Sequence, residues 1–419
     1  MVMRGGFGIM YNRPEDSLLA LTRQDNPTSE SFGFCCGSAA TPFANGTIVY
    51  GLGASNSIYS YPFNPATATG INPVTNTPNG EAVQVYAVPK NFPTAYAYIY
   101  SFETDFTFKK DYVFTIGYQG SDDHRLLHIV DQKFLYPSSG LAATNFTDIF
   151  NIAPDANSNY NALNTTFSKR LSNGIQFQEN FRWAKSLDTV SYEGPGEGTN
   201  ATYPQNFQSE YGPSDFDVKY NETISALYAL PFFRNQKGWM GKALGGWRVN
   251  TIFTFHTGFP WTPKSGEAQL TPGGEALSPT RPYEYLCENG GSCALTGQSN
   301  SAFLRPNGNF PGGGSAYFLY TYPTGLTTLP PGIGRNVFRG PWYKDVDFSI
   351  NKAIKMPNKV LGEATLLDLR LNIFNAFNQQ NFAPFNFGDA STFVDNPQFG
   401  QPTQELAGRA LELQARFSF

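Results

Sequence analysis

The segment 94–109, TAYAYIYSFETDFTFK, carries an aromatic ring at almost every second position. Its even positions hold the rings, Tyr96, Tyr98, Tyr100, Phe102, Phe106 and Phe108. Its odd positions are small, polar or charged. A period of two residues places the two sets on opposite faces of a β-strand, whereas a helix would scatter them. Soluble strands usually have about five or six residues. The length and the aromatic face therefore favour a strand that crosses a membrane in a β-barrel.

The same alternation recurs along the chain and predicts ten or eleven strands. The clear segments are 94–109, 112–121, 174–187, 244–257, 345–351, 366–373 and 411–419, and the weaker ones are 2–11, 160–171 and 216–230. Short hairpins are expected at Lys110-Asp111 and at Ser172–Gly174, where Asn-Gly is a strong hairpin signal. Long connections rich in Gly, Pro, Ser, Thr and Asn occupy 14–93, 122–159, 188–213, 258–337 and 376–407.

This organisation predicts an all-β fold, a transmembrane antiparallel β-barrel that is partial, with about 10–11 long strands and long extracellular loops. Short turns on one side and long loops on the other are typical of outer-membrane barrels. Loops of this length argue against most compact soluble folds. A soluble β-sandwich is the main alternative, because its strands alternate in the same way but bury the apolar face against a second sheet.

Composition narrows the classes of protein further. Only 15% of the residues are charged, against about 25% in an average soluble domain. The net charge of −4 gives no basic surface for nucleic acid, so no nucleic-acid partner is expected. No apolar run reaches the length of a transmembrane helix. The amino terminus also lacks the features of a secretory signal, so that either the protein stays inside the cell or the mature start lies further upstream.

The charged residues of the clear strands occupy the positions opposite the apolar ones. We expect the following side chains to face the barrel lumen: Glu103, Asp105, Asp345, Asp347, Asp368, Arg370, Glu412 and Arg416. A charge on the lipid face costs about 2–4 kcal/mol at the midplane, which explains this placement without a substrate. Cross-strand pairing is the favoured role for these residues, and a polar path or a socket for a plug is the alternative.

The chain ends in an alternating strand with two terminal aromatic residues. Phe417 and Phe419 suit a signal for the barrel assembly machinery. Four cysteines are present, and Cys287 and Cys293 lie in LCENGGSC, where two glycines allow the loop to close. A Cys287–Cys293 disulfide is favoured in an oxidising compartment, with free thiols as the second choice. A metal site is the last choice, because Cys35-Cys36 matches zinc spacing poorly.

The sequence contains no catalytic constellation, so the protein is not expected to be an enzyme or to hold a cofactor or a metal. HExxH, GxSxG and GxxxxGK[ST] are all missing from it. The run DDHRLLH at 122–128 contains potential metal ligands, namely Asp122, Asp123, His124 and His128. Because it falls in a predicted long connection, a solvated loop tip is the favoured interpretation.

Several segments resemble TonB-dependent receptors of the Oar-like type. They are RGGFGIMYNRP at the amino terminus, YNALNTTFSKRLSNGIQFQENFRWAKSLD at 160–188, SDFDVKYNETISALYALPF at 214–232, GGWRVNTIFTFHTGFPWTP at 245–263, FRGPWYKDVDFSINKAI at 338–354 and LDLRLNIFNAFNQQNF at 367–382. The segments follow one another in the order of the family. The resemblance implies an outer-membrane protein of a Gram-negative-type bacterium that takes up a scarce large solute with energy from TonB.

The resemblance also implies what this chain lacks. Receptors of this type have about 22 barrel strands around an amino-terminal plug, and this sequence has about half of the strands. We therefore expect residues 1–419 to be the carboxyl-terminal portion of the barrel, without plug or signal peptide and inactive in gated transport by itself. Its expected partners are outer-membrane lipid, the barrel assembly machinery, the missing plug and barrel half and, through that missing part, TonB.

Three other functions remain open at this point. A self-contained passive porin would need more strands. A surface adhesin or interaction protein would use the long loops, above all 258–337, to bind carbohydrate or protein. A soluble enzyme is the last option.

Overall fold

The computed structural model describes a chain dominated by long β-strands. The described residues are 1–13, 50–52, 59–61, 83–90, 93–131, 146–191, 204–264, 269–270, 276–277, 281, 283–286, 303–304, 316–319, 334–356, 365–385, 390–392, 398 and 400–418.

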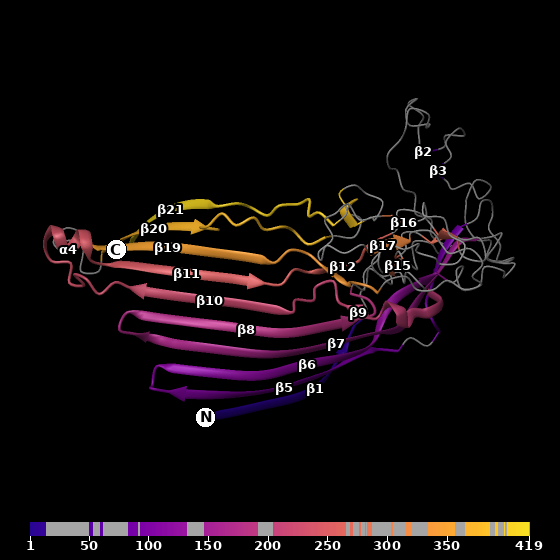
Figure 1. Ribbon diagram of the computed structural model, residues 1–419, viewed down its shortest axis with the longest axis horizontal. Helices are drawn as coiled ribbons and strands as arrows, with labels where there is room; N and C mark the ends of the chain where they lie inside the picture. Colours follow the sequence, from indigo (N-terminus) through magenta and orange to yellow (C-terminus); the bar gives the residue numbers. More distant parts are fainter. Residues whose placement is uncertain are drawn as a thin grey trace.

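Ten strands form one continuous antiparallel sheet (Figure 1). Its members in spatial order are β1 (Val2–Asn12), β5 (Ala95–Phe108), β6 (Tyr112–Asp131), β7 (Phe146–Ser172), β8 (Ile175–Asp188), β10 (Tyr220–Ala229), β11 (Trp247–His256), β19 (Tyr343–Lys355), β20 (Leu366–Phe374) and β21 (Ala410–Ser418). Spatial order follows chain order throughout. This confirms the predicted antiparallel membrane-type sheet, and each clear sequence segment corresponds to one strand.

Smaller elements gather mainly where the long connections begin. Two of them join the main sheet, β4 (Val83–Ala87) on β7 and β9 (Gly212–Pro213) on β8. The others are β2 (Tyr50–Leu52), β3 (Tyr59–Tyr61), η3 (Pro204–Glu210), β12 (Pro260–Trp261), β13 (Gln269–Leu270), β14 (Ala276–Leu277), β15 (Tyr283–Leu286), β16 (Phe303–Leu304), β17 (Ala316–Leu319), β18 (Phe338–Arg339) and η6 (Ala390–Thr392). Helix α4 (Gly238–Leu244) lies at the opposite end, beside the short turns (Figure 1).

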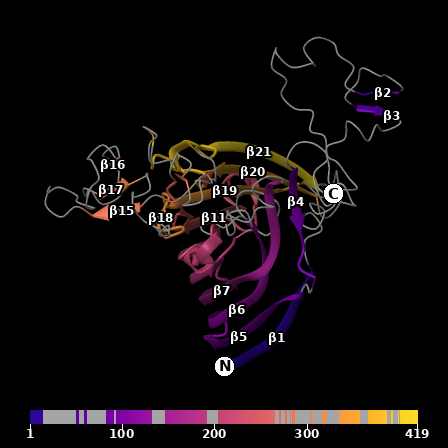
Figure 2. The same cartoon turned by 90° about the vertical axis from the view of Figure 1, so that its right-hand side faces the viewer.

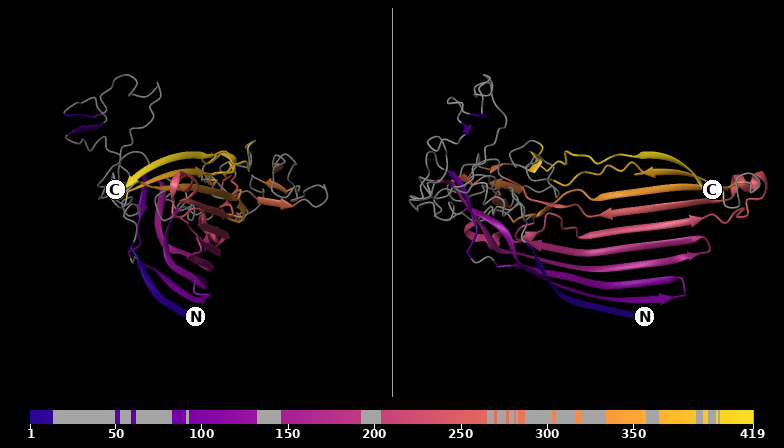
Figure 3. Two further views of the ribbon diagram at one scale, coloured as in Figure 1. Left: turned by 90° about the vertical axis from the view of Figure 1, so that its left-hand side faces the viewer. Right: turned by 180° about the vertical axis from the view of Figure 1, so that it is seen from behind.

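The sheet curls into a trough that leaves two outer edges. Figure 2 and the left panel of Figure 3 show the strands following an arc from β1 to β21. Within the described residues β1 pairs with β5 alone and β21 with β20 alone. Each of these strands therefore keeps one edge of backbone N–H and C=O groups without a partner strand in the described part of the chain.

Two tight turns fix the register at the short-turn end. Asn173 and Gly174 have positive φ angles of 52° and 82°, as a type I′ hairpin requires, and they confirm the predicted Asn-Gly turn. A Cβ at Gly174 would lie 2.6 Å from the Ala229 carbonyl oxygen, so this position needs glycine. Lys109 and Lys110, with φ of 48° and 57°, make the other turn, one residue earlier than predicted.

The pairing register places the predicted apolar set on one face of the whole sheet. We call it the aromatic face, and it includes Phe7, Tyr100, Phe102, Tyr118, Leu163, Trp183, Tyr220, Phe253, Val346, Phe348, Ile373 and Leu411. No second sheet covers it in the described part of the chain. Phe102 is 53% exposed, Trp183 52% and Leu413 80%. A β-sandwich would bury these side chains, so that alternative is wrong for this region.

We call the ten-stranded sheet the wall. The buried apolar core is small and lies beyond the wall, at the loop end of β6 and β7. Leu127, Ile129 and Ile152 form it, and Tyr86 of β4 and Phe150 pack against it. The wall itself needs no such core if its apolar face contacts hydrocarbon.

The DDHRLLH run does not form a loop, contrary to the prediction. It lies inside β6, which continues to Asp131 and stays paired with β7. Arg125, with a φ of 61°, and two shifts of register between His124 and His128 carry the strand through this polar sequence. His128 is fully buried, so the prediction of a solvated tip is also wrong.

Candidate functional site

The face opposite the aromatic face carries most of the polar side chains, and we call it the polar face. All eight side chains predicted to face a lumen lie on it by register: Glu103, Asp105, Asp345, Asp347, Asp368, Arg370, Glu412 and Arg416. They fall into two groups at opposite sides of the trough, with β6, β7, β8, β10 and β11 between them. The structure thus does not bring them together into one constellation.

The first group joins β1, β5 and β6. Arg4 Nη1 lies 2.7 Å from Glu103 Oε1 and 2.7 Å from Asp105 Oδ2. Thr115 Oγ1 donates a hydrogen bond of 2.7 Å to Asp105 Oδ1. These contacts tie three neighbouring strands across the polar face. The sequence interpretation missed Arg4, because the 2–11 segment alternates too weakly to assign its faces.

The second group joins β19, β20 and β21. Arg370 Nε donates to Asn351 Oδ1 at 2.7 Å, and Asn372 Nδ2 donates to Glu412 Oε2 at 3.0 Å. Asp368 lies directly opposite Arg416 in the register. Cross-strand pairs of this kind stabilise neighbouring strands. Their geometry can hold strands in register and line a polar passage.

Charges are not confined to the polar face, contrary to the prediction. Lys352 lies on the aromatic face near the short-turn end, and its Nζ donates to the carbonyls of Lys242 and Ala243 at 2.6 and 3.0 Å, at the carboxyl end of α4. A long side chain can keep its charge at a polar border in this way. Glu179 and Glu222 lie further inside the aromatic face, on β8 and β10, where their side chains are hydrogen-bonded to each other.

A second polar region lies at the loop end, and we call it the collar. Three ion pairs define it, Asp188–Arg335, Glu210–Arg281 and Asp217–Arg339. The carboxylates come from the end of β8, η3 and the approach to β10, and the arginines come from residues 281–339. Both side chains of the Glu210–Arg281 pair, with nitrogen and oxygen 3.1 Å apart, are 4% exposed. The collar therefore consists of paired charges, and the side chains of its three carboxylates are only 2–4% exposed.

Arg335 is the central residue of the collar. Besides Asp188, its guanidinium donates to the Glu210 carbonyl at 2.8 Å and to Ser191 Oγ at 3.1 Å. The next residue, Asn336, donates to the Pro213 carbonyl at 2.8 Å. These bonds fasten the chain before β18 onto η3 and β9. Sequence interpretation missed the collar, because most of its members (Asp188, Glu210, Arg281 and Arg335) stand in segments predicted as long connections. Isolated charges in a charge-poor sequence were the available signal.

His128 forms a third polar contact beside the small core. Its ring stacks on Phe207 with ring centroids 3.8 Å apart, and its Nε2 is hydrogen-bonded to Asp155 Oδ1. This hydrogen bond, followed by the charge of the histidine, lowers the pKa of Asp155 from its ordinary value, while burial acts in the opposite direction. Two of the potential metal ligands lie close together, with His124 Nε2 3.4 Å from Asp122 Oδ2. His128 is hydrogen-bonded to Asp155 and does not join them.

No group of three His, Cys, Asp or Glu side chains in the described residues is arranged to hold a metal ion. None of the helices there has the length and apolar character to cross a membrane. Phe417 lies on the aromatic face of β21. Phe419, Cys35, Cys36, Cys287 and Cys293 lie outside the described residues, so the terminal aromatic signal and the disulfide stay predictions.

Comparison with known proteins agrees with this architecture. A family described as outer membrane beta barrel domain matches residues 1–414. The chain belongs to this family, and the protein is a β-barrel protein of the Gram-negative-type outer membrane. The search of curated proteins found no match.

Solved structures with a similar arrangement of strands are outer-membrane transporters and receptors. The transporter YddB from Escherichia coli has 10% identity and a TM-score of 0.42, over 80% of this chain and 34% of its own. The FrpB iron transporter from Neisseria meningitidis has 11% identity and a TM-score of 0.38, over 79% and 32%. The siderophore receptor PirA from Pseudomonas aeruginosa has 12% identity and a TM-score of 0.26, over 77% and 39%. The chain spans about a third of the length of these proteins. Similarities this weak transfer no substrate or partner to it.

Proposed function

We propose that this chain is part of the wall of a TonB-dependent receptor of the Oar-like type, which takes up a scarce large solute through the outer membrane. The observation that carries the proposal is the ten-stranded trough, with one exposed apolar face and one cross-linked polar face. The ordered motif resemblance in the sequence supports the receptor class. In this proposal the polar face lines the lumen, and residues outside the chain supply the plug and the TonB contact.

The two outer edges support a wall that is completed by further strands. In a bilayer each unpaired backbone N–H or C=O group costs several kcal/mol, so membrane sheets close without an edge. Within the described residues, β1 and β21 each have one edge without a partner strand. We propose that additional strands lie between them, in the manner of a barrel wider than ten strands.

Cysteine cross-linking in outer membranes tests this arrangement. The four native cysteines are replaced by serine, and Phe7→Cys in β1 is combined in turn with Leu411→Cys, Leu413→Cys and Ala415→Cys in β21. All four positions lie on the aromatic face. A short bismaleimide reaches only between neighbouring strands, so the proposal expects no cross-link within the chain for any of these pairs.

The matched control pairs Phe7→Cys with Tyr100→Cys, its register partner on β5. This pair must cross-link in the same membranes. If a β1–β21 pair cross-links as efficiently as the control, the chain closes on itself and the proposal of intervening strands is wrong.

A conductance measurement tests the gated receptor against a passive pore. The protein is isolated from outer membranes in mild detergent with the chains that assemble with it, and it is inserted into planar bilayers. A plugged receptor is expected to give no steady ion current. A stable open conductance from the intact assembly would favour the passive porin.

A further inference from the structure

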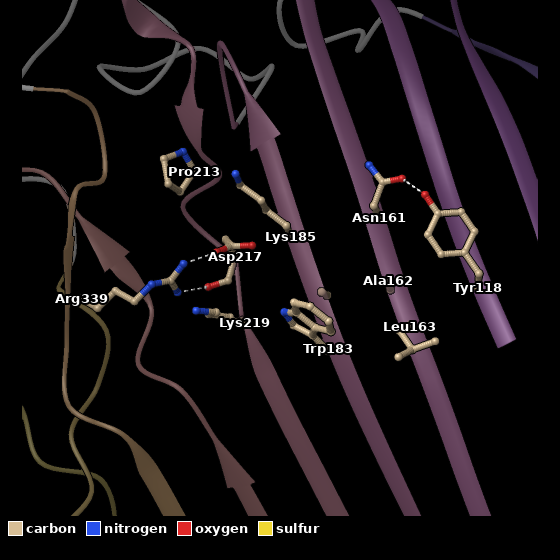
Figure 4. Close-up of a pocket in the computed structure, with 11 residues that line it drawn as sticks. Tyr118, Asn161, Ala162, Leu163, Trp183, Lys185, Pro213, Asp217, Lys219 and Arg339 are labelled. Atoms are coloured by element: carbon tan, nitrogen blue, oxygen red, sulfur yellow. Dashed lines mark hydrogen bonds and ion pairs between the residues drawn. The ribbon is translucent and has the colours of Figure 1, made fainter. Parts of the chain in front are cut away.

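A cavity of about 660 Å³ opens over β6, β7 and β8, beside the segment that leads into β10 (Figure 4). Its residues combine an apolar group with a cationic group. Those that carry the argument are Tyr118, Leu163, Trp183, Lys185, Lys219 and Arg339. The Asp217–Arg339 ion pair of the collar lies at the edge of this space.

The floor of the cavity belongs to the aromatic face. Tyr118, Leu163 and Trp183 are successive register partners on β6, β7 and β8, so their side chains lie on the same side of the sheet. Tyr118 and Trp183 are both exposed. Because a membrane barrel turns its apolar face to hydrocarbon, the cavity opens toward lipid rather than toward the lumen.

The height of the cavity matches the border of the membrane. Trp183 follows Ile175, the first residue of β8, by eight positions. At ~3.3 Å per residue and a tilt of about 40°, this corresponds to a rise of roughly 20 Å. Lys185 lies two residues further, near the limit of an apolar band of about 25 Å. The rim of the cavity therefore lies at headgroup level on the side of the long loops, which is the outer leaflet.

The rim carries an excess of positive charge. Figure 4 shows Lys185, Lys219 and Arg339 on one side of Trp183, with Asp217 among them. Arg339 is paired with Asp217. Lys219 Nζ lies 5.2 Å from the centre of the Tyr220 ring. Within the described residues neither lysine has a carboxylate partner, so two ammonium groups remain unneutralised at the mouth of an apolar cavity.

We propose that this cavity binds a phosphate-bearing lipid of the outer leaflet. The phosphate is held by Lys185 and Lys219 with Arg339 beside them, because ammonium and guanidinium groups make strong charge-assisted hydrogen bonds to phosphate oxygens. The acyl chain lies against Leu163 and Trp183. A free soluble phosphate would use the rim and leave this apolar floor unoccupied, so the combination of rim and floor specifies an amphiphile.

Native mass spectrometry of the protein extracted from outer membranes tests the proposal. The probes are phosphatidic acid and phosphatidylcholine with identical acyl chains, added from mixed detergent micelles. Each basic residue near an anionic lipid surface changes affinity about fivefold. Lys185→Gln/Lys219→Gln is therefore expected to weaken binding of phosphatidic acid at least about tenfold, and each single variant to have an intermediate effect.

The matched control is Lys109→Gln/Lys110→Gln, which removes the same charge from an exposed turn at the other end of the wall. It is expected to retain wild-type binding. Unchanged binding in the Lys185 and Lys219 variants, or an equal loss in the control pair, would overturn the proposal.

Two further results decide the source of the phosphate. Phosphatidylcholine carries a phosphate whose charge is balanced by choline, so equal binding of it would show that the two lysines do not select an anionic headgroup and would overturn the proposal. Displacement of phosphatidic acid by an equal concentration of inorganic phosphate would indicate a soluble-anion site and would also overturn the lipid proposal. Neither outcome bears on the cross-links that test the intervening strands.

Discussion

The wall and the collar obey opposite rules of burial. In the wall, large apolar side chains are exposed, whereas in the collar the carboxylate side chains are buried. Strand β8 passes through both regions: Trp183 is 52% exposed, and Asp188, five residues later, is 1% exposed. The exposed fraction of a side chain therefore has different energetic consequences at different levels of the same strand. The consequence depends on whether hydrocarbon or water surrounds that level.

The largest expected effect comes from removing one partner of a buried ion pair in the collar. Arg335→Ala leaves the Asp188 carboxylate, whose side chain is 2% exposed, without its main partner. Breaking a buried pair in this way costs about 3–5 kcal/mol. We expect the free energy of unfolding in detergent to fall by this amount, measured by urea titration.

The control for this variant is Arg4→Ala on the polar face of the wall. Arg4 also contacts two carboxylates, but its side chain is 58% exposed. Exposed ion pairs contribute little to stability, so its urea midpoint is expected to stay close to that of the wild type. An equal loss in both variants would mean that the collar is not distinct from the wall.

The next largest effect is expected from placing a charged side chain on the aromatic face of the wall. Phe253→Arg puts a guanidinium on the aromatic face of β11, six residues from the short-turn end of that strand. A charge on the lipid face costs about 2–4 kcal/mol near the midplane. We expect loss of the heat-modifiable, folded form from outer-membrane fractions.

Thr254→Arg is the matched control, one residue further on the same strand. It lies on the polar face opposite Asp345 in the register, so the new charge gains a carboxylate neighbour. Normal assembly is expected. If Thr254→Arg fails and Phe253→Arg assembles, the assignment of the two faces is inverted.

The wall was predictable from sequence, because a period of two residues is a local signal. The face on which Phe102 and Trp183 lie can be predicted from the apolar residues two positions away from each. The Asn173-Gly174 turn fixes the register of β7 and β8. The collar could not be predicted in this way. Arg335 and Asp188 are 147 residues apart in sequence, and no local pattern connects them. The same reason hid the cavity, whose lysines stand on β8 and just before β10.

The polar face was predicted as a face and not as a set of contacts. Glu103 and Arg370 were assigned to it by alternation, but the position of Arg4 beside Glu103 depends on how β1 pairs with β5. His128 was misplaced for a different reason. Loop-like composition at 122–128 outweighed the strand signal, because bulges let β6 continue through a polar sequence.

A smaller effect is expected from removing one methyl group, either from the small buried core or from the aromatic face of the wall. Ile152 is fully buried in the small core, and Ile116 is 37% exposed on the aromatic face. Ile→Val in a packed core costs about 1 kcal/mol. We expect this loss for Ile152→Val in urea titration, whereas Ile116→Val should change little because lipid or detergent fills the space. Equal losses would indicate that the wall has protein packed against it.

The smallest effect is the acid sensitivity of the His128–Asp155 contact. The hydrogen bond from His128 lowers the pKa of Asp155. Its folded pKa therefore lies below its unfolded value of about 3.9. The contact adds stability above that unfolded value and loses it as the pH falls through the folded pKa. The side chain of Asp155 is 63% exposed, so solvent reduces the effect. We expect the urea midpoints of wild type and Asp155→Asn to differ at pH 7, and the difference to shrink steadily as the pH falls below about 3.9. A difference that does not change over that range would show that the carboxylate charge is not what holds His128 in place.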